Sequence, residues 1–141
     1  MAIRYNADSR TFMLETRDSS YLMKVSRFGN LLHLYYGGKI PDENLDYLLK
    51  RYDRGFSPNP NEAGSDRTFS LDYLPQEYST DGKGDYRIPS IEVVNKDGSQ
   101  IFSGKYAGHE IYKGKYKVEG MPSLRIASGD SVETLEIRLK D

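Results

Sequence analysis

The sequence predicts a mainly β fold, an antiparallel β-sandwich with one short helix near residues 43–52. Apolar residues alternate with polar ones along much of the chain, which is typical of strands that bury one face. Turn-forming residues recur between these runs at short spacing, as they do in sandwiches. Only 37% of the 141 residues are hydrophobic, which favours a sheet with one face in water over a buried α/β core.

Three runs carry the strand pattern most clearly. Residues 21–26 and 31–36 place large apolar side chains at alternate positions, and in 135–140 leucine and isoleucine alternate strictly with charged residues. Turn signals at 6–9, 17–19 and 28–30 separate the N-terminal runs. We therefore expect a strand with one buried face in each run.

A hairpin is predicted around Asp97-Gly98, which lies between the apolar runs 91–94 and 101–102. A type I′ turn needs positive φ at both central residues, and Asp tolerates this conformation while Gly adopts it freely. The two runs should therefore be neighbouring strands.

The short helix is predicted from Leu45, Leu48, Leu49 and Tyr52, which fall on one stripe at helical spacing. Acidic residues near its start and basic residues near its end would complement the helix dipole. Asp53 then follows the end of this helix and opens a loop.

Residues 54–86 show neither the alternation typical of a strand nor the apolar spacing typical of a helix. The stretch 52–60 combines an acid, a base, aromatic rings, two prolines and a glycine, which suits a shaped surface loop better than a flexible linker. Irregular segments of this length in compact domains are usually functional or disordered. Phe56, Phe69 and Leu71 supply apolar anchors, so we expect the segment to pack onto the domain.

The overall composition argues against several classes of function. A net charge of −1 gives no global field for nucleic acid or an anionic membrane, and the absence of cysteine excludes disulfides and thiolate metal sites. The N-terminus lacks a secretory signal and no apolar run is long enough to cross a bilayer. We expect a cytoplasmic protein without a metal, a cofactor, a nucleic-acid partner or a membrane partner.

Individual motifs give weak functional signals. His33 and His109 lack a second ligand at metal spacing, and a surface or cross-strand role suits His33. The turn at 82–85 is a poor phosphate site, and the lysines and tyrosines of 105–117 suit a solvated strand edge. Twelve tyrosines without tryptophan suggest carbohydrate binding, but tyrosine is also simply a good strand residue.

Asp53 is the best single candidate for a ligand contact, because it lies at the mouth of the irregular loop. The alternative role is a local ion pair with Arg51 or Arg54, worth under about 1 kcal/mol if exposed.

Several blocks resemble one known family in the same order along essentially the whole chain. Residues 31–37 (LLHLYYG), 54–60 (RGFSPNP), 70–78 (SLDYLPQEY), 84–89 (GDYRIP), 109–115 (HEIYKGK) and 133–137 (ETLEI) resemble the N-terminal region of family 36 glycoside hydrolases, the bacterial α-galactosidases. The resemblance implies a large twisted sandwich, the galactose-mutarotase-like supersandwich. In the family a (β/α)8 barrel follows it. Two barrel aspartates there hydrolyse terminal α-galactosides such as melibiose and raffinose with retention.

The resemblance also implies what this chain lacks. The barrel is not within residues 1–141, so no catalytic residue is expected here and the chain alone should be inactive. We expect residues 1–141 to be a single domain, the first part of a supersandwich truncated from a larger enzyme. Alternatives are a free-standing carbohydrate-binding sandwich and a purely structural assembly domain.

One residue gains a role from the resemblance. In the tetrameric members, a sandwich loop reaches the catalytic pocket of a neighbouring subunit, and Asp53 matches the aspartate placed at the galactose site. An ionised carboxylate accepts hydrogen bonds from sugar hydroxyls, and its charge strengthens them. Arg54, Phe56 and Arg67 are further expected contacts to the neighbouring subunit.

Overall fold

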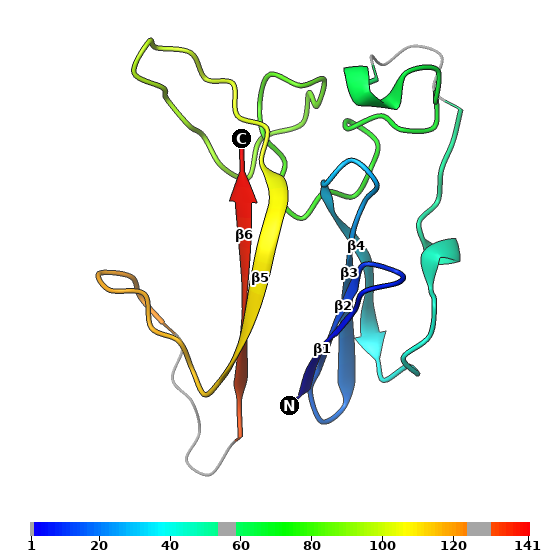
Figure 1. The fold of residues 1–141 in the computed structure, drawn as a ribbon, viewed down its shortest axis with the longest axis vertical. Helices are drawn as coiled ribbons and strands as arrows, with labels where there is room; N and C mark the ends of the chain where they lie inside the picture. The colour runs from blue at the N-terminus through cyan, green and yellow to red at the C-terminus, as the bar shows by residue number, and fades with distance from the viewer. Residues whose placement is uncertain (1, 54–58, 124–130) are drawn as a thin grey trace.

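The chain forms two antiparallel sheets (Figure 1). This computed structural model describes residues 2–53, 59–123 and 131–141. The strands are β1 (Ala2–Asn6), β2 (Thr11–Glu15), β3 (Ser19–Val25), β4 (Leu31–Gly38), β5 (Lys105–Lys113) and β6 (Glu133–Lys140), and the 3-10 turns are η1 (Asp46–Leu48) and η2 (Asn61–Ala63). One sheet has the order β1-β2-β3-β4 and the other pairs β5 with β6. The predicted mainly β, antiparallel sandwich is confirmed.

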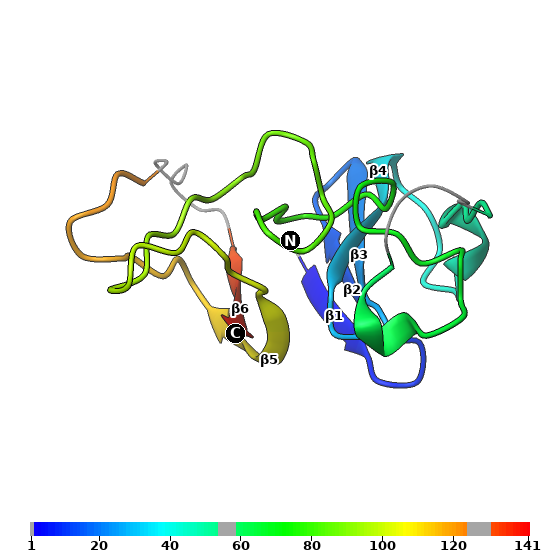
Figure 2. The same cartoon turned by 90° about the horizontal axis from the view of Figure 1, so that it is seen from above.

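The two sheets pack on each other through one apolar cluster. Phe12 of β2 and Val25 of β3 are buried there, and Leu135 and Ile137 of β6 pack against the cluster. At the same seam, a backbone N–H of β1 donates to the Glu133 carboxylate over 2.7 Å. Figures 1 and 2 accordingly show β6 beside β1. The strict alternation in 135–139 thus correctly marks the face of β6 that meets the core.

The opposite face of the four-stranded sheet is covered as well. Met13, Leu22 and Leu34 are buried on that face, together with Leu45 from the segment that follows β4. The prediction of a single buried face is therefore wrong for β3 and also for β4, where Leu31 and Leu34 are buried in the clusters on opposite faces. The reason is that an irregular segment, which a period-two pattern does not reveal, folds back over the sheet.

The helical stripe of residues 43–52 yields only the single 3-10 turn η1. Its hydrogen bonds run from Leu48 N to Leu45 O (2.9 Å) and from Leu49 N to Asp46 O (3.1 Å). Of the four stripe residues only Leu45 is buried, and Tyr52 is exposed. A helix this short needs an apolar face packed along its length, because nucleation is unfavourable. Without that packing the predicted short helix shrinks to one turn.

The irregular segment packs around β4, as its apolar residues predict. Phe69, Leu71 and Leu74 are buried with Leu32 in a separate cluster. The segment also pairs with the edge of β4, where His33 N donates to the carbonyl of residue 75 over 2.7 Å. Residues 59–86 are therefore built into the domain. The predicted anchor at position 56 lies outside the described residues.

The turn at Asp97-Gly98 forms, but the predicted hairpin does not. Gly98 N donates to Asn95 O, and Asn95 N donates to Ser99 O, both over 2.9 Å. Only Gly98 has positive φ (84°), so the turn is not type I′ but resembles a type I turn followed by a left-handed glycine. The flanks 91–94 and 101–102 are not strands. Their apolar residues are largely exposed, so no packed face supports a ladder.

Replacing Gly29 with alanine should destabilise the domain more than the same change at Gly98. Both have positive φ (83° and 84°), which costs a side-chain-bearing residue about 1–2 kcal/mol. Only at Gly29 would the added Cβ also meet a neighbour, Lys105 Cβ at 3.3 Å, because Gly29 O accepts a hydrogen bond from Tyr106 of β5 over 2.8 Å. Denaturant unfolding of both variants measures the difference. Equal losses would contradict the close approach of this turn to β5.

Candidate functional site

Asp53 and Arg67, both predicted site residues, meet on the surface. Arg67 Nε lies 2.7 Å from Asp53 Oδ1, and the two side chains are 59% and 67% exposed. An exposed pair of this kind contributes under about 1 kcal/mol to stability. The ion pair orients the carboxylate toward Arg67, while the exposed side chain stays accessible to a ligand. Arg54 and Phe56 lie outside the described residues.

A tight turn beside Asp66 positions Arg67. Asp66 Oδ1 accepts hydrogen bonds from the Thr68 backbone N–H (3.0 Å) and hydroxyl (2.6 Å), and Asp66 Oδ2 pairs with Arg27. The hydrogen bonds from Thr68, with the charge of Arg27, hold the pKa of Asp66 below its usual range. Asn59 Nδ2 also donates to the Asp66 carbonyl over 3.0 Å. The backbone on either side of Arg67 is therefore fixed.

Aromatic packing anchors the other side of the pair. Tyr52, next to Asp53, meets Tyr73 edge to face, with ring centroids 4.9 Å apart at 83°. Tyr73 lies between Leu71 and Leu74, both of which are buried in the core cluster around β4. This contact connects the exposed carboxylate to the packed part of the irregular segment.

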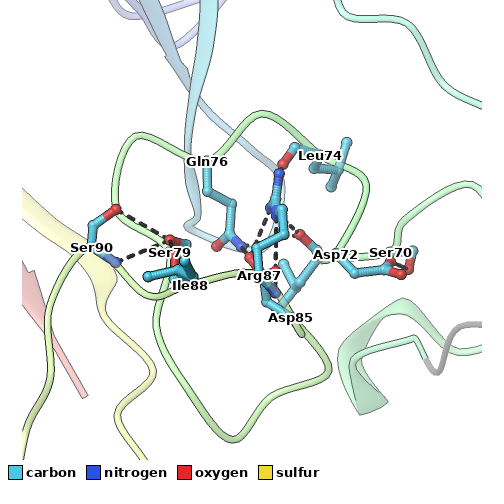
Figure 3. A network of polar contacts seen from close by, with 10 residues as sticks. Ser70, Asp72, Leu74, Gln76, Ser79, Asp85, Arg87, Ile88 and Ser90 are labelled. Carbon is cyan, nitrogen blue, oxygen red and sulfur yellow. Dashed lines mark hydrogen bonds and ion pairs between the residues drawn. The ribbon is translucent and has the colours of Figure 1, made fainter.

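A polar network built on Asp85 and Arg87 holds that segment in place (Figure 3). The Asp85 side chain is only 1% exposed and takes a two-pronged contact from Arg87, at 2.9 Å from Nε and 2.7 Å from Nη2. Gln76 Nε2 donates to the same carboxylate over 2.7 Å. Arg87 Nη2 also donates to the carbonyls of Leu71 (2.7 Å) and Leu74 (2.9 Å). The hydrogen bond to Asp85 raises the pKa of Arg87.

The sequence analysis missed this network. Asp85 and Arg87 are two positions apart in an irregular segment. No sequence pattern there indicates that Asp85 is buried or that Arg87 reaches the carbonyls of Leu71 and Leu74. The only available signal was composition, because a charged pair among glycine and proline marks a loop with its own internal hydrogen bonds.

Both histidines have structural roles. His33 Nδ1 lies 3.2 Å from Glu77 Oε1, and Tyr21 OH donates to both oxygens of that carboxylate over 2.6 Å. Burial, followed by the interaction with Glu77, raises the pKa of Tyr21, so this hydroxyl stays protonated. His109 packs against the Phe12 ring at a centroid distance of 4.8 Å. The cross-strand role predicted for His33 suits this geometry.

Among the residues that the structure describes, no group of three or more His, Asp or Glu side chains is arranged to hold a metal ion. Over the same residues, no helix has the length and apolar character required to cross a bilayer.

Comparison with known proteins identifies close relatives. Residues 29–141 match the family described as Glycosyl hydrolase family 36 N-terminal domain. The chain is 45% identical over 141 residues to the bifunctional alpha-galactosidase/sucrose kinase AgaSK of Mediterraneibacter gnavus and 41% identical over 141 residues to the alpha-galactosidase AgaA of Geobacillus stearothermophilus. These alignments cover 100% of this chain but only 15% and 19% of the relatives. A solved structure of the galactosidase domain of AgaSK superposes with a TM-score of 0.91 at 44% identity, over 99% of this chain and 19% of that one.

Proposed function

Because the chain belongs to the glycosyl hydrolase family 36 N-terminal domain family, we propose that it is the non-catalytic N-terminal region of an α-galactosidase. The reaction of that enzyme is retaining hydrolysis of terminal α-galactosides such as melibiose and raffinose. The observation that carries the proposal is the identity of more than 40% to two alpha-galactosidases along all 141 residues of this chain. A cytoplasmic location, expected from the sequence, is part of the same proposal.

The catalytic groups belong to a barrel outside these 141 residues, so the chain alone is inactive. The small share of each relative that the chain spans, under a fifth, supports this part of the proposal. We also propose that residues 1–141 are the first part of a larger sandwich. The two-stranded sheet of β5 and β6 supports this, since a sheet of two strands is marginally stable without further partners.

The role of the domain is to assist assembly of a homotetramer and to complete a neighbouring subunit's active site. Asp53 supports this role because its carboxylate is exposed, ionisable and held in one orientation by Arg67. A group that is to contact a ligand in another subunit must project from the surface of its own domain. The substrate-binding carboxylate is thus assigned to Asp53, with Arg67 as the residue that positions it.

A chimeric enzyme tests the proposal. The aligned N-terminal segment of the Geobacillus AgaA is replaced by residues 1–141 of this chain, which are 41% identical to it. We expect the chimera to hydrolyse a chromogenic α-galactoside and melibiose and to sediment as a tetramer. We expect the 141-residue chain alone, and AgaA without this segment, to show no hydrolysis.

The controls separate the alternatives. Unmodified AgaA sets the reference for activity and sedimentation, and circular dichroism establishes that each protein is folded. Hydrolysis by the chain alone would overturn the non-catalytic assignment. A folded, tetrameric chimera without activity would overturn the proposed fit between this domain and a family 36 barrel.

A further inference from the structure

A small polar hollow is lined by residues other than Asp53 and Arg67. Its volume is about 240 Å³, and its walls come from η2 with the two residues before it, from residues 83–86 and from residues 103–105 at the start of β5. The side chains that matter for recognition are Asn59, Glu62, Lys83, Tyr86, Ser103 and Lys105. Neither the sequence patterns nor the proposed function assigns a role to this hollow.

The charged groups in the hollow are of both signs. Lys105 Nζ lies 3.5 Å from Glu62 Oε1 and donates to Asn30 Oδ1 over 3.1 Å. A backbone hydrogen bond, together with the charges of Lys105 and Lys83, lowers the pKa of Glu62. The hollow therefore offers two lysine donors and one carboxylate acceptor.

Asn59 contributes an acceptor whose hydrogen-bonding capacity is unmet. Its Oδ1 is buried and has no hydrogen-bond partner among the described residues, while its Nδ2 is engaged with the Asp66 carbonyl. Buried polar atoms in folded proteins are nearly always paired, and exceptions call for a specific cause. The described part of the domain therefore leaves the hydrogen bonding of Asn59 incomplete.

Tyr86 adds an aromatic face. Its side chain is 79% exposed although its neighbours in sequence, Asp85 and Arg87, are tied into the polar network below. The backbone that carries the ring is therefore fixed before any ligand arrives. Rigid, amphipathic tyrosine rings beside hydrogen-bonding groups provide contact area at low cost in conformational entropy.

We propose that this hollow binds a neutral saccharide, with one sugar ring inside and Tyr86 against its apolar face. A sugar hydroxyl both donates and accepts, so it pairs with Glu62 as well as with the lysines. An anion would face the Glu62 carboxylate, and a cation would face two ammonium groups. The volume is just below the usual range for pockets of drug-sized ligands, which suits a single ring. This second site goes beyond the role proposed for Asp53.

Titration of the chain, followed by amide NMR shifts, tests the site. Galactose, methyl α-galactoside, raffinose and inorganic phosphate are added separately to the labelled protein. We expect the sugars to shift resonances of residues 59–62, 83–86 and 103–105, and phosphate to leave them unchanged. Tyr86→Ala should weaken sugar binding by about tenfold, the effect of losing one aromatic contact.

Tyr36→Ala is the matched control. Tyr36 is also a strongly exposed tyrosine, at 71%, but it lies on β4 and does not line the hollow. Its replacement should leave the affinity unchanged. Absence of sugar shifts, binding of phosphate alone, or equal losses in both variants would each overturn the proposal. None of these outcomes bears on the chimera, whose hydrolysis tests the proposed function independently.

Discussion

Replacing Arg87 with alanine is expected to lower the free energy of unfolding by about 3 kcal/mol, the low end of the range for removing one partner of a buried ion pair, because only Asp85 of the two is fully buried. The expected loss of stability comes mainly from the groups that would lose Arg87 as their partner. The Asp85 carboxylate, 1% exposed, would be left buried without its two-pronged partner. The Leu71 and Leu74 carbonyls would lose a shared donor at the same time.

The opposite replacement should cost less. In Asp85→Ala the remaining charge is that of Arg87, whose side chain is 43% exposed and can be hydrated in place. Arg87→Lys should also fail to restore full stability, because a single ammonium cannot reproduce the planar fork that contacts both carboxylate oxygens. The order of loss expected from denaturant unfolding is therefore Arg87→Ala first, followed by Asp85→Ala.

The exposed ion pair of Arg138 and Glu110 provides the control for the loss of an arginine charge. Arg138 lies 2.6 Å from Glu110, and both side chains are about half exposed. Arg138→Ala removes the same type of charge from an ion pair that water already surrounds, so little change is expected. If Arg87→Ala and Arg138→Ala destabilised equally, the network around Asp85 could not be what holds the irregular segment.

The strands could be predicted because their signal is local. Side chains that alternate along residues 135–139 must fall on opposite faces of a strand, whatever the rest of the chain does. The apolar stripe at 45–52 yields only one turn, because helix formation depends on contacts with the rest of the chain. A stripe becomes a helix only if a surface accepts its whole length, and here the sheet accepts Leu45 alone as a buried residue.

The candidate site residues also differ in how far the sequence predicts them. Asp53 could be singled out from its place at the start of the loop, but its ion-pair partner could not. The sequence offered Arg51 and Arg54 because they are close along the chain. Among the described residues the structure pairs Asp53 with Arg67, which the Asp66 turn presents, and position 54 lies outside those residues. Which charged residues pair across an irregular segment depends on how that segment folds, and the composition of the segment does not determine its fold.

In the chimeric enzyme, Asp53→Ala is expected to reduce kcat/KM for an α-galactoside by about 10- to 100-fold, as hydrogen bonds to a charged group contribute roughly 1.5–3 kcal/mol. The reason is loss of an ionised acceptor for sugar hydroxyls. Stability should hardly change, because the side chain is 67% exposed. Asp18→Ala, at a more exposed aspartate (88%) far along the chain in the turn before β3, should leave kcat/KM unchanged.

Arg67→Ala should give a smaller loss, because it frees the Asp53 carboxylate to rotate without removing it. The double variant should then be no worse than Asp53→Ala, since a positioning residue has no effect once the group it positions is gone. Additive losses would mean that Arg67 contacts the substrate independently. An unchanged kcat/KM in Asp53→Ala would remove Asp53 from the substrate site altogether.

Subunit mixing decides whether Asp53 acts within its own subunit or across the interface. Tetramers are reassembled from Asp53→Ala chimeras and from chimeras whose barrel lacks its nucleophile. Each parent is impaired, the first through its sandwich loop and the second through its chemistry. If the loop serves a neighbouring subunit, an intact loop from the second parent completes an intact barrel of the first, and activity rises above the sum of the separate parents. If Asp53 serves its own subunit, no mixed tetramer contains a complete site, and mixing recovers nothing.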